Sequence, residues 1–172
     1  MQTFLPYPDF SESAKCLDYR RLGKQRLEAK QIINLLEKHD QGVDITKLPW
    51  GNHPAVKMWL GHTLALKCYY NTILDEWISR GYNNTMLHYQ ILDSNPLHPI
   101  FSYPNWLGNP SFHDSHKSNL YRKDPSYYNQ FSHLPSDLPY LWPDTYVSTE
   151  RELLPTTNNT DSKNSLNRYD EG

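Results

Sequence analysis

The chain has 172 residues, 37% of them apolar, and a net charge of −2 at pH 7. This length suits one domain with its own hydrophobic core and is too short for two ordinary domains. No run of eighteen apolar residues occurs, and the first ten residues lack the basic and apolar segments of a secretion signal. We therefore expect an intracellular monomer without a membrane partner, working in the cytoplasm or nucleoid, or in a host cell if the source is viral.

The charges are unevenly distributed along the sequence. Residues 1–133 hold 14 Lys and Arg against 12 Asp and Glu, whereas residues 134–172 hold 3 against 7. Six of the basic residues fall between positions 15 and 30, where only Asp18 and Glu28 oppose them. Such a local basic segment is compatible with binding a phosphate backbone, although it is found more often on an ordinary solvated helix face.

The N-terminal segment predicts an extended arm followed by a long helix. Pro6 and Pro8 prevent a helix throughout the first ten residues, and Ser11 or Ser13 can cap a helix spanning about residues 12–38. Along one stripe of this helix the side chains change from polar to apolar, in the order Arg21, Gln25, Glu28, Ile32 and Leu35. The second half is therefore expected to face the core, while the first half puts charge on the same stripe.

Two further helices are predicted. The segment from Pro54 to Arg80 has a favourable first helical position, a broad apolar surface and an Arg-Gly end. It predicts one central helix about 40 Å long at 1.5 Å per residue. A shorter helix is expected from Ser111 or Phe112 to Lys123, because a proline follows it closely.

The remaining segments are expected to be irregular. Residues 82–110 contain four prolines and predict a long loop, and residues 148–172 are polar and acidic, which predicts a disordered tail after a domain of residues 1–147. Strand-like alternation is nearly absent. The sequence therefore predicts an all-α fold, a compact single domain of three main helices with long Pro-rich connecting loops and an extended N-terminal arm.

The first predicted helix carries a candidate binding surface. Several of its basic side chains can reach one phosphate backbone, with arginine suited to bidentate contact, namely Arg20, Arg21, Lys24 and Arg26. Glu28 shares a face with Arg21 and Gln25, where a carboxylate held among cations can stabilise a developing positive charge or act as a general base. The alternative is a salt-bridged helix end, in which Glu28 pairs with Arg21 or Lys24.

The third predicted helix carries a second basic cluster. His113, His116 and Lys117 lie at helical spacing, and Arg122 and Lys123 follow beside tyrosines, as in grooves that bind phosphates and exposed bases. The His-x-x-His pair can also supply two metal ligands, but the sequence places no third ligand and contains no catalytic-zinc motif. A hydrogen-bonding surface is the preferred interpretation, and we expect no metal.

Three blocks of the sequence carry a family resemblance. They are "LDYRRLGKQRLEAKQI", the segment from "HPAVKMW" to "EWISRGY", and "HDSHKSNLYRKDPSYYNQF" followed by "LPYLWP". Together they cover about residues 1–143, and they resemble the pyrimidine-dimer DNA glycosylases of the phage endonuclease V type. The closer likeness is to a bacterial and viral branch of that family that opens with "MQTFLPYPDF".

The resemblance implies an all-α DNA repair enzyme that needs no cofactor. Its partner would be double-stranded DNA with a damaged or modified base, and its reaction would cleave the N-glycosidic bond of a pyrimidine. In the family, the N-terminal amine attacks the sugar C1′ to form an imine, a first-helix glutamate assists, and β-elimination then cuts the strand. Whether this chain has the lyase step is left open.

The family's functional residues carry over by position, with two departures. Arg20 and Arg26 match phosphate-binding arginines, the arm from Met1 to Thr3 matches the catalytic N-terminus, and His116 or Lys117 lies near another basic contact. The family's catalytic acid directly follows the Tyr-Arg pair, and here Arg21 occupies that position. We therefore take Glu28 as the candidate for the assisting carboxylate. Gln2 is large enough that Met1 should be retained, which makes the Met1 amine the candidate nucleophile.

The candidate site has two parts. The catalytic candidates are Met1, Glu28 and Arg21. The DNA-binding candidates are Thr3, Arg20, Lys24, Gln25, Arg26, His113, His116, Lys117 and Arg122. Two other functions remain open: a non-catalytic module for distorted or modified DNA, which both departures favour, and a metal-dependent hydrolase using His113 and His116.

Overall fold

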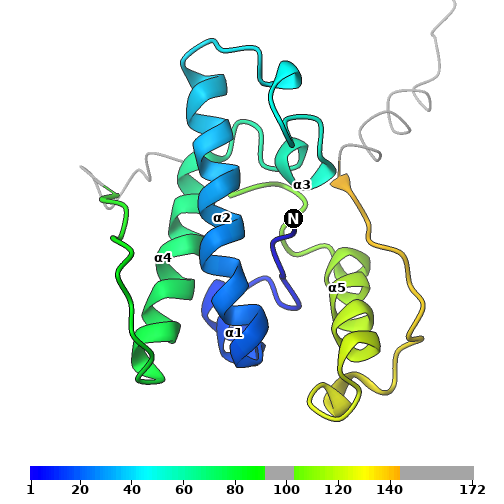
Figure 1. Cartoon of the computed structure of the whole chain (residues 1–172). Helices are drawn as coiled ribbons and strands as arrows, with labels where there is room; N and C mark the ends of the chain where they lie inside the picture. Colours follow the sequence, from blue (N-terminus) through cyan, green and yellow to red (C-terminus); the bar gives the residue numbers. More distant parts are fainter. Residues whose placement is uncertain (92–102, 144–172) are drawn as a thin grey trace, which may run out of the picture.

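The computed structural model describes residues 1–91 and 103–143, and within them every regular element is a helix (Figure 1). The α-helices are α1 (Phe10–Cys16), α2 (Tyr19–Asp40), α3 (Pro54–Lys57), α4 (Thr63–Ser79) and α5 (Pro110–Lys123), with short 3-10 helices at Ile45–Lys47 and Asn129–Phe131. The all-α prediction is confirmed, and α2, α4 and α5 are the three main helices. The predicted tail, residues 148–172, lies outside the described residues.

The prediction of one continuous helix over residues 12–38 is wrong, because the helical conformation is interrupted between α1 and α2. Asp9, rather than Ser11 or Ser13, caps α1 by accepting from the Glu12 N–H. Asp18 has extended backbone angles and caps α2 by accepting from the N–H groups of Arg20 and Arg21. A side chain that satisfies two otherwise unpaired N–H groups stabilises a new helix start at this position.

The predicted 40 Å central helix is also wrong. The helix that begins at Pro54 ends after one turn, and Gly61 adopts a φ of +77° before α4 begins at Thr63. Glycine reaches this left-handed conformation without the steric cost that a side chain adds. The 17 residues of α4 give a length of about 26 Å, and the turn before it buries Trp59 against the N-terminal arm.

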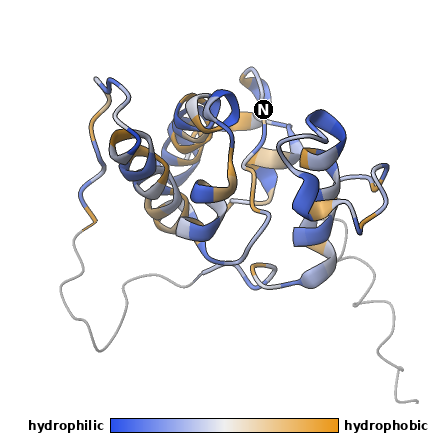
Figure 2. Ribbon diagram, turned by 90° about the horizontal axis from the view of Figure 1, so that it is seen from below, coloured by the Kyte–Doolittle hydropathy of each residue, from blue (hydrophilic) through white to orange (hydrophobic). Residues whose placement is uncertain are grey.

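The core lies where α2 packs against α4, and α1 packs against the same helix. Ile32 and Leu35 are buried as predicted. Gly23 stays inside α2, and a Cβ there would lie 3.0 Å from a ring carbon of Trp77, so the glycine lets the two helices approach closely. Figure 2 shows polar and apolar residues alternating along the ribbons, as expected for helices with one buried face.

The N-terminal arm runs through the interior between α2 and α5 (Figure 1). Thr3, Phe4 and Leu5 are buried, whereas Met1 is only partly covered. Within residues 1–91 and 103–143 the arm lies beside no strand, and side chains of Gln25 and His116 pair with its backbone N–H groups instead. No helix in residues 1–91 or 103–143 has both the length and the apolar character needed to cross a membrane.

Candidate functional site

A cavity of about 960 Å³ opens between the start of the arm, the first half of α2 and the chain around and after the end of α5. Its volume is at the upper end of the range for ligand sites, which is about 300–1,000 Å³. The lining residues are Met1, Gln2, Phe4, Asp18, Tyr19, Arg20, Arg21, Lys24, Glu28, His53, Lys123, Asp124, Tyr127, Tyr140 and Trp142. Five of the predicted site residues therefore meet in one place: Met1, Arg20, Arg21, Lys24 and Glu28.

Glu28 lies directly beside the N-terminal arm. Its Oε2 is 3.3 Å from the Gln2 backbone nitrogen and 3.2 Å from Gln25 Nε2, and both nitrogens donate to it. Within residues 1–91 and 103–143, none of the ion pairs includes Glu28, so the alternative of a salt bridge to Arg21 or Lys24 is wrong. The two neutral donors hold the carboxylate at the cavity without neutralising it.

His53 brings a third titratable group to the N-terminus and Glu28. Burial lowers the pKa of His53, the N-terminal amine lowers it further, and Glu28 raises it. The His53 Nδ1 accepts from the Ala55 N–H at 3.1 Å, so the proton of the neutral ring resides on Nε2. A neutral imidazole, an amine and a carboxylate thus share one cavity, an arrangement suited to proton transfer.

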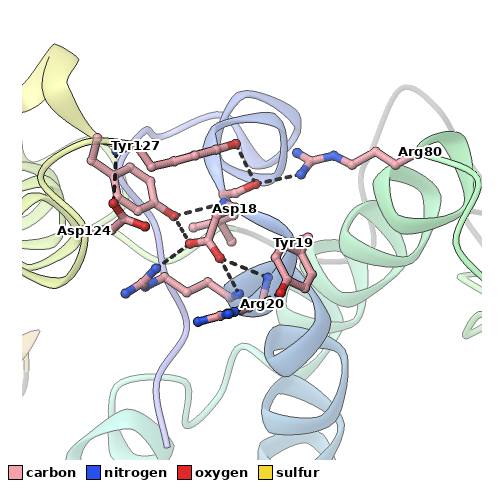
Figure 3. A network of polar contacts seen from close by, with 9 residues as sticks. Asp18, Tyr19, Arg20, Arg80, Asp124 and Tyr127 are labelled. Atoms are coloured by element: carbon pink, nitrogen blue, oxygen red, sulfur yellow. Dashed lines mark hydrogen bonds and ion pairs between the residues drawn. The ribbon is translucent and has the colours of Figure 1, made fainter.

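Arg21, at the position of the family's acid, is held by an ion pair to Asp18 with 2.5 Å between Nη1 and Oδ2. The Tyr128 hydroxyl donates to the same carboxylate at 2.6 Å, and Figure 3 shows Asp18 at the centre of this network. Burial opposes the ionisation of Asp18, but the bonds from Tyr128 and Arg21 outweigh it and lower its pKa. The network joins the start of α2 to the chain that follows α5.

Lys123 adds to the positive charge of the cavity. Burial lowers the pKa of Lys123, and the nearby Arg21, Arg122 and Lys24 lower it further, while Glu28 raises it. Cations this close repel one another, and an anion bound between them would stabilise them. Part of the cavity wall is aromatic, with the His53 and Trp142 rings 6.1 Å apart and the Tyr140 and Trp142 rings 5.8 Å apart.

Four predicted DNA contacts are instead buried and hold the arm. Gln25 Oε1 accepts from the Phe4 N–H at 3.0 Å, and its Nε2 donates to the Gln2 carbonyl at 2.9 Å. The Thr3 hydroxyl accepts from the Trp59 indole N–H at 3.0 Å. His113 and His116 are buried in α5 with their rings against the arm. None of the four side chains lines the cavity.

The two histidines bind the backbone of one residue of the arm, Leu5, one at its N–H and the other at its carbonyl oxygen. His116 Nδ1 accepts from the Leu5 N–H at 3.2 Å, and His113 Nδ1 lies 2.8 Å from the Leu5 carbonyl oxygen. His113 Nε2 accepts from the Gly108 N–H, so Nδ1 carries the proton and donates it to Leu5. Both nitrogens of His113 are thereby occupied by hydrogen bonds. The ring is therefore not free to serve as a ligand in the metal-dependent hydrolase considered above.

The His116 clamp predicts that acid destabilises the fold. Burial and the neighbouring His113 lower the pKa of His116 from 6.5 to about 3. Because the unfolded chain binds the proton more tightly, the stabilisation is complete above pH 6.5 and is lost as the pH falls towards 3. We expect His116→Asn, whose Oδ1 can accept from Leu5, to flatten the dependence of the free energy of unfolding on pH between 6.5 and 5 by up to about 1.4 kcal/mol per pH unit.

Urea unfolding at several pH values measures this slope. The exposed His133 provides the matched control, since His133→Asn leaves the clamp intact. Equal slopes for His116→Asn and the unaltered protein would contradict the assignment of His116 as a neutral clamp.

Three predicted contacts lie away from the cavity lining. Arg26 stacks on Trp77 with its guanidinium carbon 3.9 Å from the ring centroid. Lys117 pairs with Asp114 at 2.9 Å, and Arg122 donates to the Asn119 side chain. Arg26 follows Lys24 by only two residues, so at 3.6 residues per turn it lies on nearly the opposite side of α2, towards Trp77 of α4.

Sequence reasoning missed several cavity residues. Gln2, His53, Tyr140 and Trp142 belong to the arm, a helix cap and the chain after α5, so no local pattern connects them. Lys123 belongs to the basic cluster of the third predicted helix but is not among the predicted DNA contacts. In the sequence, the "LPYLWP" block is the signal for the aromatic wall, but it does not show which way its aromatic rings point.

The fold and the cavity define a small helical protein whose own N-terminus lies beside a carboxylate in a cationic site, which suits a polyanion such as a nucleic acid. The family model of pyrimidine dimer DNA glycosylases matches residues 1–90, more than half of the chain, and the chain belongs to that family. Its substrate is therefore DNA. Neither a curated protein nor a solved structure matches the chain.

Proposed function

We propose that the cavity excises a damaged or modified pyrimidine from duplex DNA, with the Met1 amine as nucleophile and Glu28 as the assisting carboxylate. The observation that carries this proposal is the position of Glu28 Oε2, 3.3 Å from the Gln2 nitrogen and therefore one residue from the amine. An amine that can attack and a carboxylate that can take up its proton are the pair of groups that such catalysis uses, and both line this cavity.

The chemistry follows from these two groups. The neutral amine attacks C1′, the C1′–N1 bond breaks, and the pyrimidine leaves with the bonding electrons and takes up a proton. Glu28 accepts the proton that the amine loses, and opening of the sugar ring gives an imine between the protein and C1′. Removal of a C2′ proton then breaks the C3′–O bond and cuts the strand, which is the associated abasic-site lyase activity.

We assign the phosphate contacts of this reaction to the cations at the cavity. Arg20 is exposed, Lys24 is exposed one turn later, and Lys123 faces them from α5. Together they can hold the phosphates that flank an extruded nucleotide, while the aromatic wall offers a surface for its base. Arg21 would contribute through the electrostatic potential of its charge in the cavity rather than by direct contact, since Asp18 holds its guanidinium. Arg26, Lys117 and Arg122 would contact DNA only outside the cavity.

The buried residues have a different role in this proposal. Thr3, Gln25, His113 and His116 are positioning residues that fix the arm so that its amine meets C1′. Thr3 ties the arm to Trp59, and the other three bond to the arm from the surrounding helices. All four lie too deep to reach DNA without rearrangement. Precise placement of a nucleophile supplies a large part of catalysis, since a misplacement of about 1 Å can cost about 100-fold in rate.

A duplex with a single thymine dimer tests the proposal. Incubation with the protein and then with alkali converts every cleaved glycosidic bond into a strand break, whether or not the protein has lyase activity. We expect breaks at the dimer and none in the undamaged duplex. Tight binding of the dimer without any break would instead favour a non-catalytic module for distorted DNA, for which the arginine at the position of the family's acid is the supporting observation.

A further inference from the structure

The side-chain nitrogen of Gln2 is a hydrogen-bond donor in the interior of the protein. The residue is only 7% exposed, and its Nε2 is buried without a hydrogen-bond partner in the described part of the chain. Leaving a buried amide nitrogen unpaired is unfavourable, because the group has lost its hydrogen bonds to water. Most buried polar groups are paired, so this one calls for an explanation.

The orientation of the amide is fixed by its neighbour. The Gln2 Oε1 accepts from the Thr3 N–H at 2.8 Å, which requires the oxygen to lie on that side and leaves Nε2 on the other. Gln2 lines the cavity together with Tyr140, and its side chain interacts with the Tyr140 hydroxyl. The unpaired donor is therefore held in place at the wall of the cavity.

Its place next to the amine indicates what it would bind. The residue that follows the nucleophile must lie close to C1′ when the amine attacks that atom. In a pyrimidine nucleotide, the exocyclic atom nearest to C1′ is O2, because it is bonded to the carbon beside N1. When the C1′–N1 bond breaks, the electron pair left on N1 is shared with O2, so a donor at O2 stabilises the developing charge.

We propose that Gln2 is a catalytic residue, whose Nε2 donates a hydrogen bond to O2 of the departing pyrimidine. The inference rests on the proposed function and extends it from the nucleophile to the leaving group. It also gives the site a preference for a base that carries a carbonyl oxygen next to its glycosidic nitrogen. A hydrogen bond that strengthens as charge develops raises the rate more than the affinity.

The test compares Gln2→Met and Gln2→Asn with the unaltered protein. Methionine keeps the length and removes the donor, whereas asparagine keeps the amide and withdraws it by one methylene. The first readout is the single-turnover rate of glycosidic cleavage at a thymine dimer. The second is the affinity for a duplex with a tetrahydrofuran residue in place of the damaged nucleotide, which has no base to meet Gln2.

We expect both variants to lower the cleavage rate by roughly 10- to 100-fold, and to change the affinity for the tetrahydrofuran duplex by less than about threefold. Equal losses in both readouts would mean that Gln2 only holds the arm, and an unchanged cleavage rate would mean that no bond to O2 forms. Either result overturns the inference alone. Failure of the unaltered protein to cleave any dimer would overturn the proposed function and the inference with it.

Discussion

Replacement of Glu28 by glutamine is expected to lower the rate of glycosidic cleavage by about 10²–10⁴-fold while leaving affinity for the lesion duplex within about threefold. Glutamine keeps an oxygen that can accept from the Gln2 N–H, so the arm should stay in place. It cannot take up the proton that the attacking amine loses. The variant therefore separates the chemical step from binding and folding.

Single-turnover cleavage of a thymine-dimer duplex and a binding titration measure the two effects. Glu12→Gln is the matched control, because Glu12 is exposed on α1 and lies outside the cavity. It should change neither quantity by more than about twofold. Cleavage by Glu28→Gln at the rate of the unaltered protein would show that another group assists the reaction.

The second large effect is expected at Gln25, which is fully buried and joins α2 to the arm. Its oxygen accepts from the Phe4 N–H and from the Tyr69 hydroxyl, and its nitrogen donates to the Gln2 carbonyl and Glu28. We expect Gln25→Met to lower the free energy of unfolding by about 2–4 kcal/mol, because it leaves buried backbone groups of the arm without hydrogen-bond partners. The cleavage rate should fall more than about 10-fold even where the variant is fully folded, since the amine is no longer held.

Urea unfolding and single-turnover cleavage at low temperature test these two effects separately. Gln31→Met makes the same change at an exposed position of α2 and should alter the free energy of unfolding by less than about 0.5 kcal/mol. A Gln25→Met protein with normal cleavage would contradict the view that the arm must be fixed from inside.

The sequence predicted the fold class and the third helix well, because both depend on local patterns. Periodicity placed Ile32 and Leu35 in the core. The third helix, α5, ends at Lys123 as predicted and begins at Pro110, one or two residues before the predicted start. The breaks at Asp18 and Gly61 were missed, since the apolar stripe continues across each of them. There a cap bond or a left-handed glycine outweighs helix propensity.

Only the part of the candidate site that lies on one helix was predicted, because the sequence shows local spacing and not distant contacts. Arg20, Lys24 and Glu28 lie one turn apart on one helix, so their spacing alone brought them together. The inward course of the arm depends on contacts with residues more than 50 and 100 positions away, such as Trp59 and His116. No local pattern reports these contacts. The polar stripe of α2 therefore has two tasks, with Gln25 holding the arm and Glu28 facing the cavity.

The most direct test of the account is to identify the atom that reacts with DNA. Borohydride reduces an imine to a stable amine, so treatment of the protein with abasic-site DNA and borohydride, followed by nuclease and trypsin, leaves a tagged peptide. Cleavage after Lys15 yields a peptide of residues 1–15 whose single amine other than Lys15 is the N-terminus. We predict the sugar remnant on the α-amine of Met1 in this peptide. A remnant on Lys24 or Lys123, or strand cleavage without any adduct, would contradict the central claim.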